Sequence, residues 1–253
     1  MPSLKEIMLG LLFFISSVSA AEIYATFNIE ADKSANLAFY SGGIVNKIHV
    51  DVSSLVKKGD LLVELQNDDL KASLQMAKAA LSRAKVALKF AKKDYERQLL
   101  IKDLIDEAQF DQYLLNYETA KVAIAEAEAK LVYQQTLLDK TEIHAPFNGV
   151  ILEKSVEVGD VVSGMMLRTI FKIQSPKERK LIFEFDQKYW KQVSIGDRVK
   201  YSVNGDSKLY EGVISKVYPI ANSDNRKIKA EVKAKGFVVG LFGDGYITVP
   251  DSK

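Results

Sequence analysis

The chain has 253 residues, of which 47% are hydrophobic, and its 35 basic and 33 acidic side chains leave a net charge of +2. This near balance gives no electrostatic drive toward nucleic acid, and no nucleic-acid partner is expected. With no cysteine and only two histidines, the chain lacks the residues for disulfides, thiol nucleophiles, zinc–thiolate centres or a His-rich metal site.

The first 20 residues have the composition of an export signal. Lys5 provides a positive charge, Ile7 to Ile15 is a nearly continuous apolar run, and Val18-Ser19-Ala20 is a small-residue cleavage site. The apolar run is shorter than the roughly 20 residues of a membrane-spanning helix. We therefore expect cleavage near Ala20 and an exported protein, with an uncleaved signal acting as a membrane anchor as the alternative.

A repeated β-pattern occurs twice, at Gly43–Leu65 and Gly149–Ile170. When Gly43 is aligned with Gly149, valines and leucines of the two copies coincide, including Val56 with Val162. Alternating apolar residues indicate half-buried strands, and the glycines between them indicate turns or close backbone approaches. The two copies predict the two halves of one flattened β-sandwich.

The residues between the two copies predict a pair of helices. Apolar residues fall on one seam with 4-3 spacing in each helix, over three to four heptads, as in a coiled coil. The first seam comprises Leu70, Leu74, Ala77, Leu81, Ala84, Leu88, Ala91 and Tyr95. The second comprises Phe110, Tyr113, Tyr117, Ala120, Ile124, Ala127, Leu131, Gln134 and Leu138.

Helix ends and charges favour an antiparallel pair. Asn67 or Asp68 is expected to cap the first helix, and Asp106 with Gln109 forms a capping-box pattern at the start of the second, so the turn falls near 101–106. Residues 71–102 carry nine basic and two acidic side chains, whereas residues 106–139 carry seven acidic and two basic ones. Complementary charge on neighbouring helices explains this distribution more simply than a membrane or nucleic-acid surface does.

The residues after Ser175-Pro176 predict a small β-barrel. Strand candidates separated by turn signals are 181–185, 198–203, 210–218, 227–234 and 246–249, with a short helix at 187–192. The fold class is thus mixed α and β. The expected organisation is a signal at 1–20, N-terminal strands and the first half-sandwich at 21–66, a helical hairpin at 67–140, the second half-sandwich at 141–174 and a barrel at 175–253.

This order resembles the periplasmic adaptors, or membrane fusion proteins (HlyD-like), of tripartite efflux systems, most of all those of resistance-nodulation-division pumps. The most specific stretch is HAPFNGVILEKSVEVGDVVSG, His144–Gly164, which resembles the family's return into its lipoyl-like sandwich. The stretches 42–65, 193–203 and 210–234 resemble the outgoing half of the sandwich and the barrel. One departure is Ser53-Ser54, which stands where the second half has Gly159-Asp160.

The resemblance implies partners and a docking site. An adaptor of this family connects an inner-membrane pump to a TolC-like outer-membrane channel, self-associates as a hexameric ring, and lies in the periplasm against the inner membrane. Aligning Asp106 with the family's tip serine puts Leu99 on the tip leucine and Tyr95 on the tip arginine, so the docking motif is only partly kept. Apolar groups at the end of an exposed hairpin also indicate a protein contact. The predicted channel-binding residues are Tyr95, Leu99, Leu104, Ile105 and Asp106.

Catalytic, cofactor-binding and metal-binding residues are not expected. His49, His144 and the Met165-Met166 pair are interpreted as surface or packing residues, and no catalytic triad or phosphate-binding loop is present. Two alternative functions remain: an adaptor of an ATP-binding-cassette or metal-ion exporter, and a biotinyl or lipoyl carrier. Lys154, between Glu153 and Ser155, lacks the setting of a carrier lysine. The cargo of an exporter and the class of pump stay open.

Overall fold

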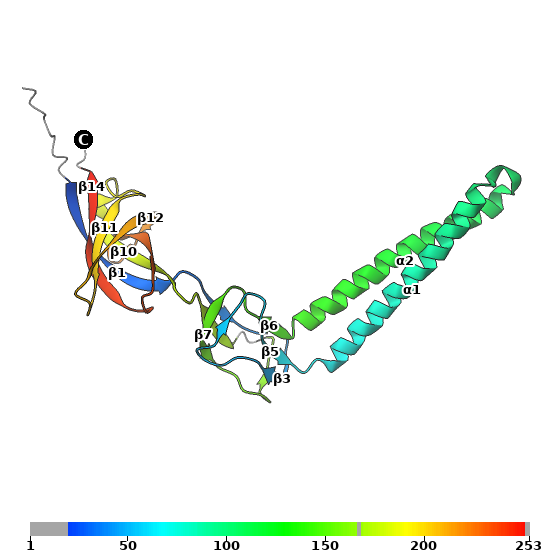
Figure 1. Cartoon of the computed structure of the whole chain (residues 1–253), viewed down its shortest axis with the longest axis horizontal. Helices are drawn as coiled ribbons and strands as arrows, with labels where there is room; N and C mark the ends of the chain where they lie inside the picture. Colours follow the sequence, from blue (N-terminus) through cyan, green and yellow to red (C-terminus); the bar gives the residue numbers. More distant parts are fainter. Residues whose placement is uncertain (1–19, 166–167, 251–253) are drawn as a thin grey trace, which may run out of the picture. The chain divides into compact units, whose positions relative to one another are not determined.

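The computed structural model describes residues 20–165 and 168–250, and the chain divides into two compact units (Figure 1). One unit contains residues 34–176, and the other combines residues up to 33 with residues from 177 onward. Of the predicted export signal, residues 1–20, only Ala20 is described, as the first residue of a strand. Neither long helix of the described part has the apolar stretch that a membrane crossing needs.

The first unit is built on a sandwich of two four-stranded sheets. One sheet has the order β2-β9-β7-β4, and the other has the order β6-β5-β3-β8. The strands that precede the helical hairpin are β2 (Ser34–Leu37), β3 (Gly43–Ile48), β4 (Leu55–Val56) and β5 (Leu61–Leu65). The strands that follow the hairpin are β6 (Glu142–His144), β7 (Gly149–Lys154), β8 (Val161–Val162) and β9 (Phe171–Gln174).

The two half-repeats exchange strands symmetrically. Gly43 of β3 pairs with Val162 of β8, and the repeat-equivalent pair, Gly149 of β7 with Val56 of β4, occurs in the other sheet. Their apolar faces form one core that contains Leu62, Leu65, Ile151, Phe171 and Ile173. Residues that the alignment of the two copies made equivalent therefore occupy equivalent places in the two sheets. Neither half of the sandwich buries its apolar face without the other half.

Gly149 shows why one position of the repeat must be glycine. A Cβ added there would lie 2.5 Å from a side-chain carbon of Ile173 and 2.8 Å from the carbonyl oxygen of Gln174. The strands β7 and β9 approach too closely for any side chain. The glycine thus serves close packing here, whereas Gly159, with φ of 94°, serves a turn.

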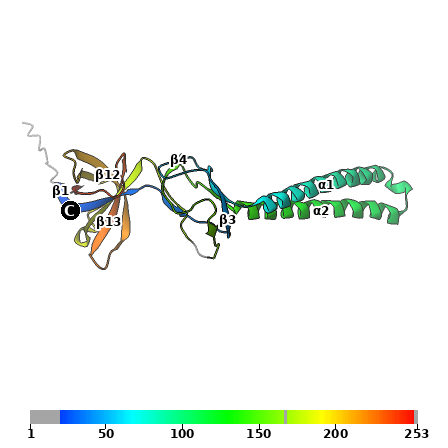
Figure 2. The same cartoon turned by 90° about the horizontal axis from the view of Figure 1, so that it is seen from below.

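Two long helices, α1 (Asp68–Leu99) and α2 (Glu107–Asp139), are inserted between β5 and β6. They lie side by side along their length in both views (Figures 1 and 2). Every predicted seam residue is buried or half-buried. The basic and acidic helices are neighbours, as the charge pattern predicted, although the salt bridges within the described hairpin join residues of the same helix.

The start of α1 differs in detail from the predicted cap. Asn67 occupies the N-cap position, but its side chain makes no capping hydrogen bond. Its Nδ2 instead donates to Oγ1 of Thr141, 3.0 Å away and itself buried, which ties the two ends of the hairpin together. At α2, Asp106 is the N-cap residue as predicted, and its carboxylate accepts from the amide of Ala108 at 3.0 Å and not from that of Gln109.

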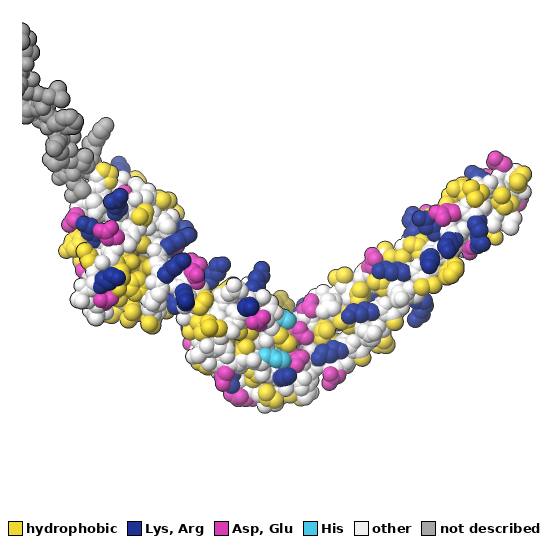
Figure 3. Space-filling view, viewed as in Figure 1, with side chains coloured by type: hydrophobic (Ala, Val, Ile, Leu, Met, Phe, Trp, Pro, Cys, Tyr) yellow, Lys and Arg dark blue, Asp and Glu magenta, His cyan; other side chains and the backbone are white. Residues whose placement is uncertain are grey.

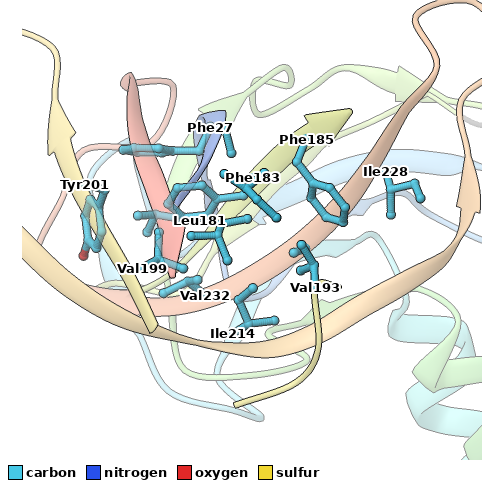
Figure 4. Packing of buried hydrophobic residues seen from close by; sticks show 14 of the residues in the cluster. Phe27, Leu181, Phe183, Phe185, Val193, Val199, Tyr201, Ile214, Ile228 and Val232 are labelled. Atoms are coloured by element: carbon cyan, nitrogen blue, oxygen red, sulfur yellow. The ribbon is translucent and has the colours of Figure 1, made fainter. Parts of the chain in front are cut away.

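The second unit is a closed barrel with the strand order β1-β10-β13-β12-β11-β14. Its elements are β1 (Ala20–Ala31), β10 (Glu178–Asp186), the short helix η2 (Gln187–Tyr189), β11 (Arg198–Val203), β12 (Leu209–Ala221), β13 (Lys227–Lys235) and β14 (Phe242–Pro250). Every predicted strand after residue 175 is present. Alternate residues of these strands meet inside, where Phe27, Phe183 and Leu181 pack together (Figure 4).

The barrel extends beyond the predicted bounds of 175–253, because it also contains β1. β1, predicted as an N-terminal strand outside the barrel, pairs with β14 over residues 20–28 and with β10 over residues 26–31. It thereby closes the barrel and supplies Ile23, Phe27 and Ile29 to the barrel core. These partners lie far away in sequence, so no local pattern around residues 20–31 could have assigned the strand to the barrel.

Candidate functional site

The tip of the helical hairpin is a short, ordered turn that displays apolar side chains. After α1 ends at Leu99, the 3-10 turn η1 (Lys102–Leu104) leads to Ile105, which is extended. The amide of Leu104 donates to the carbonyl of Ile101 at 2.9 Å, and Asp106 then caps α2. This path directs Leu104 outward, with 84% of its surface exposed.

The predicted tip residues fall into two groups. Leu99 and Leu104 are exposed, Asp106 is an exposed cap, and Ile105 is half-buried. Tyr95 lies between the helices, where its ring is stacked on Tyr117 with centroids 5.2 Å apart and also contacts Phe110 at 5.7 Å. The structure thus gives Tyr95 a role in holding the tip together, in addition to any contact that its exposed part could make.

One exposed residue of the tip, Leu100, is not among the predicted channel-binding residues. Leu100 is 86% exposed, the most exposed large apolar side chain of the described hairpin. Leu100 follows Leu99 and lies outside the 4-3 seam, and this position could have predicted its exposure from the sequence. Together, Leu99, Leu100 and Leu104 form an apolar tip patch, which is a feature that commonly marks a protein contact.

The outer faces of both helices also carry exposed apolar side chains. Those of α1 include Met76, Val86 and Phe90, and those of α2 include Leu115, Val122 and Val132. They lie outside the inter-helix seam and are interspersed with basic groups, as Figure 3 shows by the yellow and dark blue side chains along the hairpin. A hairpin that acted only as a solvated spacer would not need them.

The base of the hairpin holds both histidines of the chain in contact with glutamates. Nε2 of His144 lies 3.0 Å from Oε2 of Glu142, its Nδ1 lies 3.0 Å from the carbonyl oxygen of Gly59, and His49 lies 3.6 Å from Glu64. Partial burial acts to lower the pKa of His144, but these hydrogen bonds and the charges of Glu142 and Asp139 outweigh it, so its pKa is raised. Each histidine thus lies beside a glutamate of the sandwich.

Lys154, the residue compared with a carrier lysine, is held by two carboxylates. The Lys154 ammonium lies 2.9 Å from Glu157 and 3.7 Å from Asp51. The hydrogen bond to Glu157 is the largest influence on this group, and the pKa of Lys154 is raised. A carrier lysine needs a free amine, which this pairing opposes. Across residues 20–165 and 168–250, no three His, Asp or Glu side chains are grouped to hold a metal ion.

Comparison with known families matches residues 33–174 to the CzcB-like, barrel-sandwich hybrid domain. These residues are the sandwich and the inserted hairpin, and they make up more than half of the chain. The chain therefore belongs to this family. Membership makes it a membrane fusion protein of the periplasmic adaptor class, which the split sandwich, the hairpin and the barrel had indicated.

Individual relatives agree with this class. The cobalt-zinc-cadmium resistance protein CzcB of Cupriavidus metallidurans is 23% identical over 209 residues, covering 79% of this chain and 39% of the relative. The multidrug resistance protein MdtA of Escherichia coli is 30% identical over 123 residues, covering 48% of this chain and 30% of the relative. The chain thus spans well under half of the length of these two relatives.

The fold also agrees with a solved structure. MacA from Actinobacillus actinomycetemcomitans superposes with a TM-score of 0.71 at 22% identity, over 91% of this chain and 79% of the MacA chain. The agreement covers strands and helices of both units. The agreement at 22% identity supports the fold.

Proposed function

We propose that this protein is the periplasmic adaptor of a tripartite efflux system, in which it links an inner-membrane pump to an outer-membrane channel and supports the export of small molecules. The observation that carries the proposal is a split sandwich of the CzcB-like family from which a long hairpin presents an ordered apolar tip. The protein acts without catalysis, by holding the assembly together. Its location is the periplasm beside the inner membrane, reached through the export signal at residues 1–20.

The tip patch is the proposed contact with a TolC-like channel. Leu100 and Leu104 project from a turn whose backbone is fixed by the Asp106 cap and by Tyr95 packing. Burying two leucines in a partner provides about 1.5–3 kcal/mol for each. One tip therefore binds weakly, and several tips acting together bind tightly through avidity.

The exposed outer faces of α1 and α2 support self-association, which we expect to be a hexameric ring. Met76 and Phe90 on α1 lie two heptads apart, and Leu115 and Val122 on α2 lie one heptad apart, so each pair occupies one side of its helix. Neighbouring hairpins that packed on these sides would remove the apolar surface from water. Coiled-coil geometry within each hairpin would keep both stripes straight.

A metal-ion exporter is the second candidate, because the family model and one relative carry the name of a cobalt-zinc-cadmium resistance protein. The relative MdtA is named for multidrug resistance. The described residues group no metal ligands, so on either reading the cargo is selected by the pump. An adaptor of an ATP-binding-cassette pump fits the same surfaces, whereas a biotinyl or lipoyl carrier conflicts with the ion-paired Lys154.

Photo-crosslinking in living cells tests the adaptor proposal. A crosslinkable residue at Leu104 is expected to trap an outer-membrane channel, and one at Phe90 is expected to trap a second copy of the chain. The control is Gln75, an exposed position near the hairpin base, which should trap no channel. Recovery of only an unrelated cytoplasmic enzyme from Leu104 would refute the proposal. Amino-terminal sequencing of the mature protein decides whether the signal is cleaved.

A further inference from the structure

The barrel contains an apolar pocket that has no part in the hairpin contacts. It lies between the residues around η2 and the end of β12, with a volume of about 830 Å³. Its lining includes Trp190, Val217, Ile220, Ile228, Gln187 and Lys188. Pockets that bind small molecules generally have volumes of about 300–1,000 Å³ and a mainly apolar lining with a few polar groups.

A β-bulge forms one wall of the pocket. Val217 pairs with Ala230 and Ala221 pairs with Ile228, so three residues of β12 stand opposite the single residue Lys229 of β13. Pro219, at the centre of the three, has no amide to give to the ladder. The bulge carries Ile220 away from the sheet, leaving its side chain 73% exposed.

The turn after β10 forms the opposite wall. The Asp186 carboxylate accepts from the amide of Lys188 at 2.9 Å, and the amide of Trp190 donates to the carbonyl of Gln187 at 3.0 Å. This hydrogen-bonded turn fixes the backbone at Trp190, whose side chain is nevertheless 62% exposed. Ile228, at one end of the barrel core in Figure 4, is buried and belongs to the lining between the two walls.

The charge of the pocket is positive. Lys188 is its only charged lining residue. In the part of the chain that the structure describes, no carboxylate lies within 4.0 Å of the ammonium of Lys188 or of its neighbour Lys191. Lys188 instead lies 4.8 Å from the ring centroid of Tyr189, and Lys191 lies 5.2 Å from that of Trp190. Such cation–π contacts leave an ammonium group able to pair with an anion.

We infer that this pocket binds a small amphipathic carboxylate as a free monomer. The apolar body lies between Trp190 and Ile220, and the carboxylate pairs with Lys188. Exposed tryptophan and isoleucine side chains are unfavourable in water, and an apolar ligand that covered both would relieve this cost. The inference goes beyond the proposed adaptor function and does not depend on it, because every group involved belongs to the barrel.

Trp190 is the only tryptophan of the chain, so its fluorescence reports directly on the pocket. The full chain is titrated with decanoate below the micelle concentration, and with 1-decanol as the uncharged counterpart. We expect a saturable change of Trp190 fluorescence with decanoate. K188Q is expected to weaken decanoate binding about tenfold, since a charge-assisted contact is lost, and to leave decanol binding unchanged.

Two further variants separate the pocket from the rest of the barrel surface. Ile220→Ser is expected to weaken the binding of both ligands, whereas Ile195→Ser, at another exposed apolar residue of the barrel outside the pocket, should weaken neither. Circular dichroism of each variant checks that the barrel is folded. Three results would overturn the inference: no saturable fluorescence change, equal affinity for decanol and decanoate, or binding only above the micelle concentration, which would indicate association with lipid aggregates.

Discussion

At the scale of single residues, one turn recurs four times with the same hydrogen bonds. In each copy the amide of the first residue donates to the side chain of the fourth, at 2.7–3.0 Å. The third residue has a positive φ. Its amide donates to one residue of a neighbouring segment, and the carbonyl of the fourth residue accepts from the amide of that same residue. The copies are 57–60, 157–160, 194–197 and 51–54. Three contain Gly-Asp, and the fourth contains Ser53-Ser54, so the turn survives this departure from the repeat.

Ser53 makes that turn strained. Its φ of 69° is a left-handed conformation, which costs a residue with a Cβ roughly 1–2 kcal/mol. Glycine avoids this cost, but it loses more conformational entropy on folding than serine does. We expect Ser53→Gly to stabilise the sandwich by up to about 1 kcal/mol, measured by urea unfolding. Ser54→Gly removes the hydroxyl that accepts from the Asp51 amide and should destabilise instead. Equal effects of the two substitutions would refute this account.

The His144 contacts predict a pH dependence. The folded pKa of His144 is raised above its ordinary value of 6.5, so its contribution to stability is present below that value and is lost as pH rises through the folded pKa. The difference in melting temperature between the unmodified chain and His144→Gln should therefore be larger at about pH 5 than at about pH 9. In a Glu142→Gln background, the difference should shrink, because the main hydrogen-bond partner has been changed. If the difference in melting temperature did not vary with pH, the raised pKa of His144 in the folded chain would be contradicted.

At the scale of elements, the hairpin has two kinds of apolar side chain: those that pack between the two helices and those that are exposed on the outer faces. Tyr95 and Phe90 are aromatic residues of the same helix, but Tyr95 stacks on Tyr117 across the seam and Phe90 is exposed. We expect Tyr95→Ala to destabilise the hairpin by about 1–3 kcal/mol, and Phe90→Ala to change its stability by less than about 0.5 kcal/mol. Hydrogen exchange of the hairpin amides, at low protein concentration, measures both. Similar losses of amide protection in the two variants would contradict the conclusion that Tyr95, but not Phe90, packs between the helices.

The elements that could be predicted from the sequence are those in which apolar residues recur at regular, short intervals. The 4-3 seam and the alternating strands of the barrel depend on neighbouring residues, so both helices and the strands from residue 178 onward were found. The place of β1 depends on pairing with β10 and β14, which no local pattern contains. At the tip, Leu104 was found because it lies in the turn, whereas Leu100 was missed because helix ends are the least certain part of a periodic pattern.

At the scale of the whole molecule, the chain has two separate hydrophobic cores, one in each compact unit. The barrel core contains Phe183 and the sandwich core contains Ile173, both fully buried. The chain crosses between the units only after residue 33 and after residue 176. Each core is therefore expected to unfold as its own cooperative unit, which gives two transitions for one chain.

Two spectroscopic signals distinguish these transitions. Trp190 is in the barrel unit, so its fluorescence follows the barrel, whereas the ellipticity at 222 nm follows the helices α1 and α2 of the other unit. Phe183→Ala should cost about 3–5 kcal/mol and lower the fluorescence midpoint alone, because it leaves a cavity only in the barrel. Ile173→Ala should lower the unfolding free energy of the sandwich by about 2–5 kcal/mol and shift the sandwich midpoint alone. Hydrogen exchange of the amides in β7 and β9 measures this change. If either variant shifted both midpoints equally, the two cores would be energetically coupled, and the hairpin-bearing unit could not be treated as a separate module.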